Sequence, residues 1–119
     1  MSPWLAVAAA LGAGGVVLGA FGAHALRARL APELLAAWQT GVLYHLLHSV
    51  ALLALALFSQ ATSRPVTLPA ALFTAGIVLF SGSLYLLTGL GQRWAGPITP
   101  LGGLCLIAGW LALLTLRRA

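Results

Sequence analysis

The stretch WLAVAAALGAGGVVLGAFGAHAL, residues 4–26, contains no lysine, arginine, aspartate or glutamate. A helix rises about 1.5 Å per residue and needs about 20 mostly apolar residues to cross the hydrocarbon core of a bilayer. Residues 4–26 are long enough and apolar enough to do so. A secretory signal peptide is disfavoured, because no positive charge precedes Trp4 and the apolar run is longer than that of a signal. We therefore expect a retained spanning helix.

The whole chain has the composition of a membrane protein. Of its 119 residues, 61% are apolar and 6% are charged, whereas soluble domains carry roughly 25% charged residues. Three further apolar stretches qualify as spans, at about residues 42–58, 68–90 and 98–116. Arginines, prolines and glycines separate them, as expected at helix ends. The sequence predicts an all-α fold, a single domain over residues 1–119 with four transmembrane helices in an antiparallel bundle.

The connection between the first two spans has the pattern of a short helix at the membrane surface. Pro32 suits a first helical turn, and Glu33 suits the positive end of the helix dipole. Apolar residues recur at helical spacing as far as Trp38, whose side chain is of a type that lies at headgroup depth. We expect an interfacial helix over about residues 31–40. The expected membrane-edge anchors are Arg27, Arg29, Glu33 and Trp38.

The first span carries small residues at helical spacing. Gly15 and Gly19 form a G-x-x-x-G motif, and Gly12 and Gly22 extend the series. Helices in lipid associate through close backbone approach, which small residues permit. We therefore expect the first span to be the packing centre of the bundle. The helix that it packs against is expected to belong to this chain, to a second copy or to another membrane protein.

Titratable and polar side chains are expected to gather at one end of the bundle. His24 ends the first span, and His45 and His48 fall one to two turns into a second span that begins near Val42. In an antiparallel bundle these helix ends lie on one side of the membrane, and the third span returns to that side. His45 and His48 share a helix face because they are three residues apart. The expected polar cluster comprises His24, Tyr44, His45, His48, Tyr85, Gln92 and Arg93.

Three interpretations of this cluster are open. In the first, its side chains form hydrogen bonds between helices and fix their register. In the second, the protein is a small transporter, channel or proton-coupled carrier, because ionisable groups inside spans usually face the bundle interior or a wet cavity. In the third, His24, His45 and His48 bind a metal or haem, although no cysteine, aspartate or second glutamate accompanies them. We favour the structural interpretation, with no cofactor and no metal.

The sequence also disfavours enzymatic and nucleic-acid functions. It contains no G-x-S-x-G, Walker or H-E-x-x-H motif, and Glu33 is its only acidic residue, so no carboxylate pair can act as acid and base. The net charge is +5, but the arginines lie singly or in pairs between apolar blocks instead of forming a nucleic-acid-binding patch. We predict a non-enzymatic structural or accessory membrane component. Its expected partners are bilayer lipids and either a second copy or another membrane protein.

The orientation of the chain in the membrane is not decided by its positive charges. Arg27, Arg29 and Arg93 are expected on one side. Arg64, Arg117 and Arg118 are expected on the other. Because cytoplasmic loops normally carry the excess of positive charge, this balance favours neither orientation.

Four blocks of the sequence together resemble the domain of unknown function 423 family. They are GAFGAHA (19–25), WQTGVLYHLLH (38–48), FSGSLYL (80–86), and GPITPLGG (96–103) with Gly109 and Trp110. Members of this family are small bacterial inner-membrane proteins similar to eukaryotic transmembrane protein 256. The resemblance implies a four-helix integral protein of the inner membrane. It carries over no site residues, because the family has no assigned biochemical role.

Overall fold

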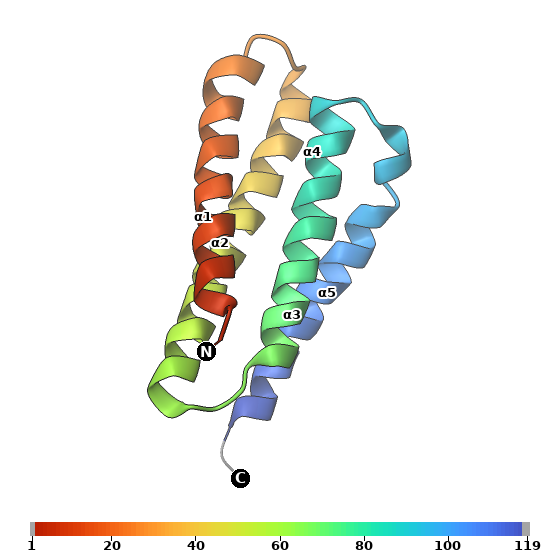
Figure 1. Cartoon of the computed structure of the whole chain (residues 1–119). Helices are drawn as coiled ribbons and strands as arrows, with labels where there is room; N and C mark the ends of the chain where they lie inside the picture. The colour runs from red at the N-terminus through yellow and green to blue at the C-terminus, as the bar shows by residue number, and fades with distance from the viewer. Residues whose placement is uncertain (1, 118–119) are drawn as a thin grey trace.

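The computed structural model describes residues 2–117, which form helices joined by short loops (Figure 1). Four helical segments are long and apolar enough to cross a membrane: Trp4–Leu26, Pro32–Thr62, Thr67–Gly89 and Arg93–Leu116. The predicted all-α fold with four spans is confirmed. The second span is much longer than the sequence indicates.

Three of the spans contain turns that differ from regular α-helix. The first comprises α1 (Trp4–Phe21) and the π-helical turn η1 (Gly22–Leu26). The third comprises α3 (Thr67–Gly76), the π-helical turn η2 (Ile77–Ser81) and α4 (Gly82–Gly89). The fourth comprises the 3₁₀ turn η3 (Arg93–Ala95), α5 (Ile98–Ala112) and the 3₁₀ turn η4 (Leu113–Leu116). π-helical turns are rare overall but often lie at functional positions. The turn η2 contains Ser81, whose hydroxyl bonds α2.

The second span, α2 (Pro32–Thr62), is one uninterrupted helix. This corrects the expected interfacial helix over residues 31–40, most of which instead forms the first turns of α2. Gly41 does not end the helix; an added Cβ there would lie 3.2 Å from Cε1 of Tyr85, so the glycine permits close packing of α4. The 31 residues of α2 extend over about 46 Å, which exceeds a hydrocarbon core of about 30 Å.

The helices form a row in which α2 and the third span are central. α1 packs on α2, α2 packs on the third span, and α5 packs on α3 and η2. α1 and α5 lie at opposite edges of the molecule (Figure 1). In the most apolar stretch of each span, 44% of the α2 residues are buried but only 17% of those in the first span. The expectation that the first span is the packing centre is therefore wrong, because its small residues approach one neighbour only.

The four glycines of the predicted packing series in the first span face α2. An added Cβ would lie 2.6 Å from Cδ2 of Leu46 at Gly15 and 2.5 Å from Nε1 of Trp38 at Gly22. A side chain at either position would force the Leu46 or the Trp38 side chain to move. This glycine stripe of the first span therefore packs against a helix of the same chain. In order, Gly12, Gly15, Gly19 and Gly22 face Ser49, Leu46, Val42 and Trp38.

A second set of glycines joins α5 to the third span. A Cβ at Gly102 would overlap the backbone nitrogen of Phe80, and one at Gly109 would lie 2.6 Å from Cδ1 of Phe73. This close approach places α5 next to the buried apolar core. The core consists of Ala8, Leu52, Leu55, Val66, Ala70, Phe73, Ile77 and Leu106.

The charged side chains lie at the two ends of the bundle along the helix axes. Arg27 and Arg29 follow the first span, Glu33 begins α2 and Arg93 begins the fourth span, all at one end. Arg64 and Arg117 lie at the other end, where α2 and the fourth span finish. Arg118 lies outside the described residues.

Candidate functional site

The candidate site is a group of hydrogen bonds around His45 and His48, near the middle of α2. Because α2 begins at Pro32, His45 lies about 20 Å from the start of the helix. Both imidazoles are buried, with 6% and 3% of their surfaces exposed. The expected depth of one to two turns is wrong, since His45 lies about three and a half turns into the helix.

His45 connects α2 to helices on two sides. Its Nε2 lies 2.7 Å from the carbonyl oxygen of Leu11 in α1, and its Nδ1 lies 2.9 Å from the hydroxyl of Tyr85 in α4. A carbonyl oxygen only accepts, so Nε2 carries the hydrogen and donates it. In the neutral ring, Nδ1 then accepts from the Tyr85 hydroxyl. One side chain thus ties three helices together.

His48 makes a second connection, from α2 to α5. The indole Nε1 of Trp110 donates to Nε2 of His48 at 2.9 Å. Because an indole nitrogen only donates, Nε2 of His48 carries no hydrogen. Its Nδ1 donates to the carbonyl oxygen of Tyr44, 2.8 Å away in the preceding turn. His48 is therefore protonated on Nδ1, whereas neutral His45 is protonated on Nε2.

Aromatic rings enclose His48. The rings of Phe73 and Trp110 stand 5.4 Å and 5.8 Å from the imidazole. They also pack edge to face against each other at 5.1 Å. Aromatic pairs of this kind contribute about 0.5–1.5 kcal/mol beyond the burial of their area. Packing as well as hydrogen bonding therefore fixes the imidazole.

Serine hydroxyls complete the polar interior. Ser81, in η2, donates to the carbonyl oxygen of Gly41 at 2.6 Å and so joins the third span to α2. Ser49 donates to the carbonyl oxygen of His45 at 2.7 Å. Within residues 2–117, every buried polar side-chain atom has a hydrogen-bond partner. The polar side chains of the interior are therefore satisfied in this part of the chain.

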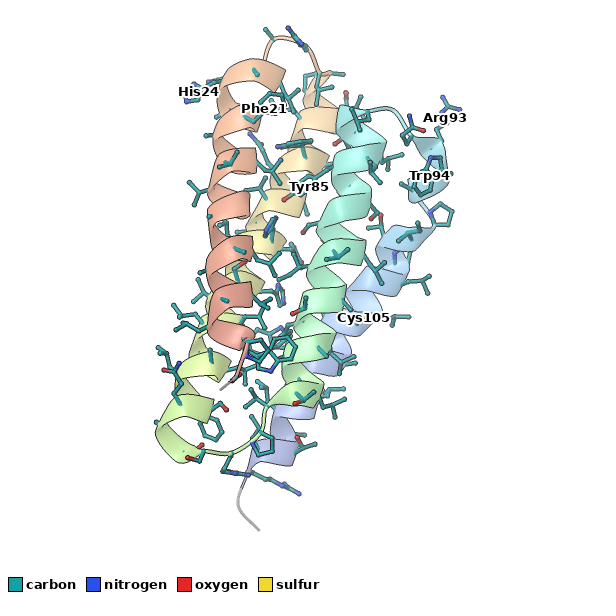
Figure 2. All side chains as sticks on the ribbon, viewed as in Figure 1. Phe21, His24, Tyr85, Arg93, Trp94 and Cys105 are labelled. Carbon is teal, nitrogen blue, oxygen red and sulfur yellow. The ribbon has the colours of Figure 1, made fainter. Side chains whose placement is uncertain are left out.

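The structure does not bring His24, Gln92 or Arg93 to this network. Figure 2 shows His24 at the end of the first span, pointing away from the bundle. Arg93 and Trp94 lie at the outer edge of the loop before α5, where Trp94 donates to the side-chain oxygen of Gln92 at 3.0 Å. The prediction of a single polar cluster at one membrane face is wrong, because α2 begins earlier than the sequence indicates.

The two tyrosines of the expected cluster have different contacts. Tyr85 projects from α4 into the bundle and bonds His45 through its hydroxyl (Figure 2). The ring of Tyr44 is 39% exposed and packs on Phe80, with ring centres 4.8 Å apart. Only the backbone carbonyl of Tyr44 bonds a histidine.

Trp38 is buried in the bundle. It is 5% exposed, and its indole nitrogen donates to the carbonyl oxygen of Leu18 at 3.1 Å. Its ring stands 4.7 Å from that of Tyr85 and fills space left by Gly22 and Gly89. The expectation of Trp38 as an interfacial anchor is corrected by this burial. The other expected anchors, Arg27, Arg29 and Glu33, are exposed.

Sequence reasoning missed Trp110 and Phe73 as parts of the site. The position of Trp110 in the sequence could have indicated its role. Tryptophans in membrane proteins are enriched at the two interfaces, whereas Trp110 lies within the fourth span. A tryptophan at such a depth needs an acceptor for its N–H, and a histidine on a neighbouring span can provide it.

The three imidazoles do not converge on a common point. Across residues 2–117, no three histidine, cysteine, aspartate or glutamate side chains are placed to hold a metal ion. A hollow of about 570 Å³ lies beside His48, between α2 and α5, with Tyr44, Phe80 and Trp110 in its wall. Leucine and isoleucine side chains line most of the remainder. It therefore has the character of a surface that faces acyl chains.

Comparison with known proteins identifies relatives along most of the chain. A family model described as Protein of unknown function (DUF423) matches residues 18–103. The UPF0382 membrane protein YwdK of Bacillus subtilis is 45% identical over 98 residues, which cover 81% of this chain and 80% of YwdK. The UPF0382 membrane protein C1782.12c of Schizosaccharomyces pombe is 40% identical over 114 residues, which cover 91% and 95% of the two chains. No solved structure matches.

A UPF0382 membrane protein of Haemophilus influenzae is a further relative, 39% identical over 98 residues that cover 82% of this chain and 79% of the relative. All three relatives are named membrane proteins, in agreement with the four apolar spans. The protein is a multi-pass membrane protein, and the resemblance noted in its sequence is confirmed. The chain belongs to the family of proteins of unknown function designated DUF423.

Proposed function

We propose that this protein is a non-enzymatic structural or accessory component of its membrane, and that its buried histidines hold the helices in register. One observation carries the proposal. All four ring nitrogens of His45 and His48 already have partners: Leu11, Tyr85, Tyr44 and Trp110. A ligand would have to displace one of these bonds, and a proton arriving at Nδ1 of His45 would have to reverse the direction of the bond with Tyr85. A saturated interior suits a protein that keeps its helix arrangement.

The surroundings of the histidines favour this role over that of a carrier. A proton or solute carrier needs a wet cavity that leads from one aqueous face to the ionisable groups. The hollow beside His48 is lined mainly by apolar side chains, and the expected polar residues Gln92 and Arg93 are exposed in the loop before α5. The polar loop and the imidazoles are therefore separated along the bundle.

An accessory role implies association with a second copy or with another membrane protein. The glycine stripe of the first span does not serve that purpose in our proposal, because α2 covers it. The exposed faces of α1 and α5 offer the larger uncovered apolar surfaces.

A proton-flux assay tests the proposal. Liposomes containing the wild-type protein should lose an imposed pH gradient at the rate of protein-free liposomes. His45→Gln and His48→Gln should leave that rate unchanged and lower the thermal stability in detergent, because glutamine cannot make both bonds of the imidazole. His24→Gln is the matched control, since exposed His24 should affect neither quantity. A rapid loss of the gradient that His45→Gln abolishes would contradict the proposal and favour a carrier.

A further inference from the structure

An apolar groove of about 600 Å³ runs between α1 and α2 and opens to the surface. Its volume lies within the range of small-molecule sites, about 300–1,000 Å³. From Leu5 to Val16, the groove extends about 16 Å along α1. This length matches one leaflet of the bilayer, which is half of a hydrocarbon core of about 30 Å. The groove is lined by Leu5, Ala8, Ala9, Gly12, Val16, Leu46, Ser49, Val50 and Leu53.

A polar pocket of about 400 Å³ lies at one end of the same helix pair. Arg64 is its charged member. Ser63 ends α2 in the left-handed conformation, with φ 58°, which is uncommon for a residue other than glycine. The Ser59 hydroxyl donates to the carbonyl oxygen of Arg64 at 2.7 Å and holds this turn in place. The lining residues are Ser2, Ser59, Gln60, Ser63, Arg64 and Pro65.

The groove and the pocket lie on the same face of α2. Residues three or four positions apart share one face of a helix. Leu46, Val50 and Leu53 of the groove are spaced in this way, and two further steps of the series lead through Leu57 to Gln60 of the pocket. On the other helix, the groove begins at Leu5 near the start of α1, and Ser2 of the pocket lies just before that helix.

The charge of the pocket favours an anion. Glu33, the only acidic side chain of the protein, lies at the opposite end of α2, so it cannot pair with Arg64. The Arg64 guanidinium lies over the ring of Phe58, 5.6 Å from its centre. α1 and α3 begin at this end of the molecule, whereas α2 and the fourth span finish there. Helix dipoles of opposite sign therefore largely cancel, and Arg64 supplies the positive charge of the pocket.

We propose that the groove and the pocket together bind one anionic glycerophospholipid, with an acyl chain between α1 and α2 and the phosphate beside Arg64. Arginine binds phosphate oxygens through charge-assisted, often bidentate hydrogen bonds. The hydroxyls of Ser2 and Ser63 can donate further bonds. A helix from a second copy is a poorer match, since a copy in the same orientation brings no acidic side chain to this end. The proposal does not depend on the role of the histidines.

Native mass spectrometry in a mild detergent tests this site. The wild-type protein should retain one molecule of added phosphatidylglycerol in preference to phosphatidylcholine. Arg64→Gln should weaken phosphatidylglycerol binding about tenfold, because a hydrogen bond to a charged group is lost. Ala9→Phe should fill the groove and weaken the binding of both lipids. Arg93→Gln, at the other end of the molecule, and Ala10→Phe, outside the groove lining, are the matched controls.

Three results would overturn the proposal. Equal retention of phosphatidylglycerol by wild type, Arg64→Gln and Ala9→Phe would show that it binds elsewhere. A lipid-free dimer that Ala9→Phe dissociates would assign the groove to a second copy. Equally tight binding of glycerol 3-phosphate would show that the pocket takes a free anion without using the groove. If Ala9→Phe is not monodisperse, Ala9→Leu fills the groove with a smaller side chain and answers the same question.

Discussion

His45 and His48 lie three residues apart on α2, yet they bond different neighbours. His45 reaches α1 and α4, whereas His48 reaches α5. The sequence predicted that both histidines and Tyr85 matter, because polar groups inside a span need partners. The sequence could not identify the Leu11 carbonyl or Trp110 as those partners, because the pairing depends on the depth at which two helices cross. The same uncertainty in depth made the sequence group exposed His24 with them.

The bond from Trp110 to His48 gives a test at the level of one side chain. Trp110→Phe keeps an aromatic ring beside Phe73 but removes the indole N–H that donates to Nε2 of His48. We expect a loss of about 1–2 kcal/mol in the free energy of unfolding, because a buried acceptor loses its partner. Unfolding in a titration with sodium dodecyl sulfate measures this loss. Trp94→Phe is the control, since Trp94 is 61% exposed, and an equal loss there would argue against a specific role for the indole–imidazole bond.

Glycine has the same effect on helix packing in α1, α2 and α5. In α1 and α5 it permits close approach of a neighbouring helix, which the sequence indicated for α1 through its G-x-x-x-G motif. In α2, Gly41 lets α4 pack closely in the same way, although the sequence predicted an interfacial helix over about residues 31–40 and a separate span that begins near residue 42. The helix continues through this position, where α4 packs against Gly41. Local pattern cannot distinguish a glycine that ends a helix from one that a neighbour contacts.

The contact between α5 and the third span gives a test at the level of helix packing. Gly102→Ala should destabilise the protein by about 1–3 kcal/mol, because the new Cβ would meet the backbone of Phe80, which cannot rotate away. Gly82→Ala is the matched control, since an added Cβ there meets nothing within 4 Å. That change should be neutral or stabilising by up to about 1 kcal/mol through helix propensity. Thermal unfolding in detergent compares the two variants, and equal stabilities would contradict close packing at Gly102.

At the scale of the whole molecule, the sequence predicted the number of spans but not which spans lie next to each other. Apolar runs set the four spans, because every backbone group in lipid must be satisfied within a helix. The row in which α2 and the third span are central could not be derived, since lipid-facing and protein-facing sides of a span are both apolar. Leu43 and Leu53 are exposed while Leu52 is buried, although all three are leucines of one helix. Hydrophobicity alone therefore gave no reason to place α1 at an edge.

The length of α2 leads to a prediction about the position of the molecule in the membrane. A helix of about 46 Å cannot fit within a core of about 30 Å, so its first turns should lie in water or among headgroups. In a Cys105→Ser background, Ala36→Cys and Ala61→Cys should react with a water-soluble maleimide in opened membranes, whereas Leu53→Cys should not, although all three positions are exposed on the protein surface.

In intact cells, a maleimide that cannot cross the membrane should label only one of the two reactive positions, because Ala36 and Ala61 lie near opposite ends of α2. The labelled position then gives the orientation that balanced arginines leave open. Similar labelling of both from outside would mean that copies insert in both directions, as three arginines on each side permit. Labelling of Leu53→Cys, or an unreactive Ala36→Cys in opened membranes, would show that a different part of α2 crosses the bilayer, and the depth assigned to His45 and His48 would change with it.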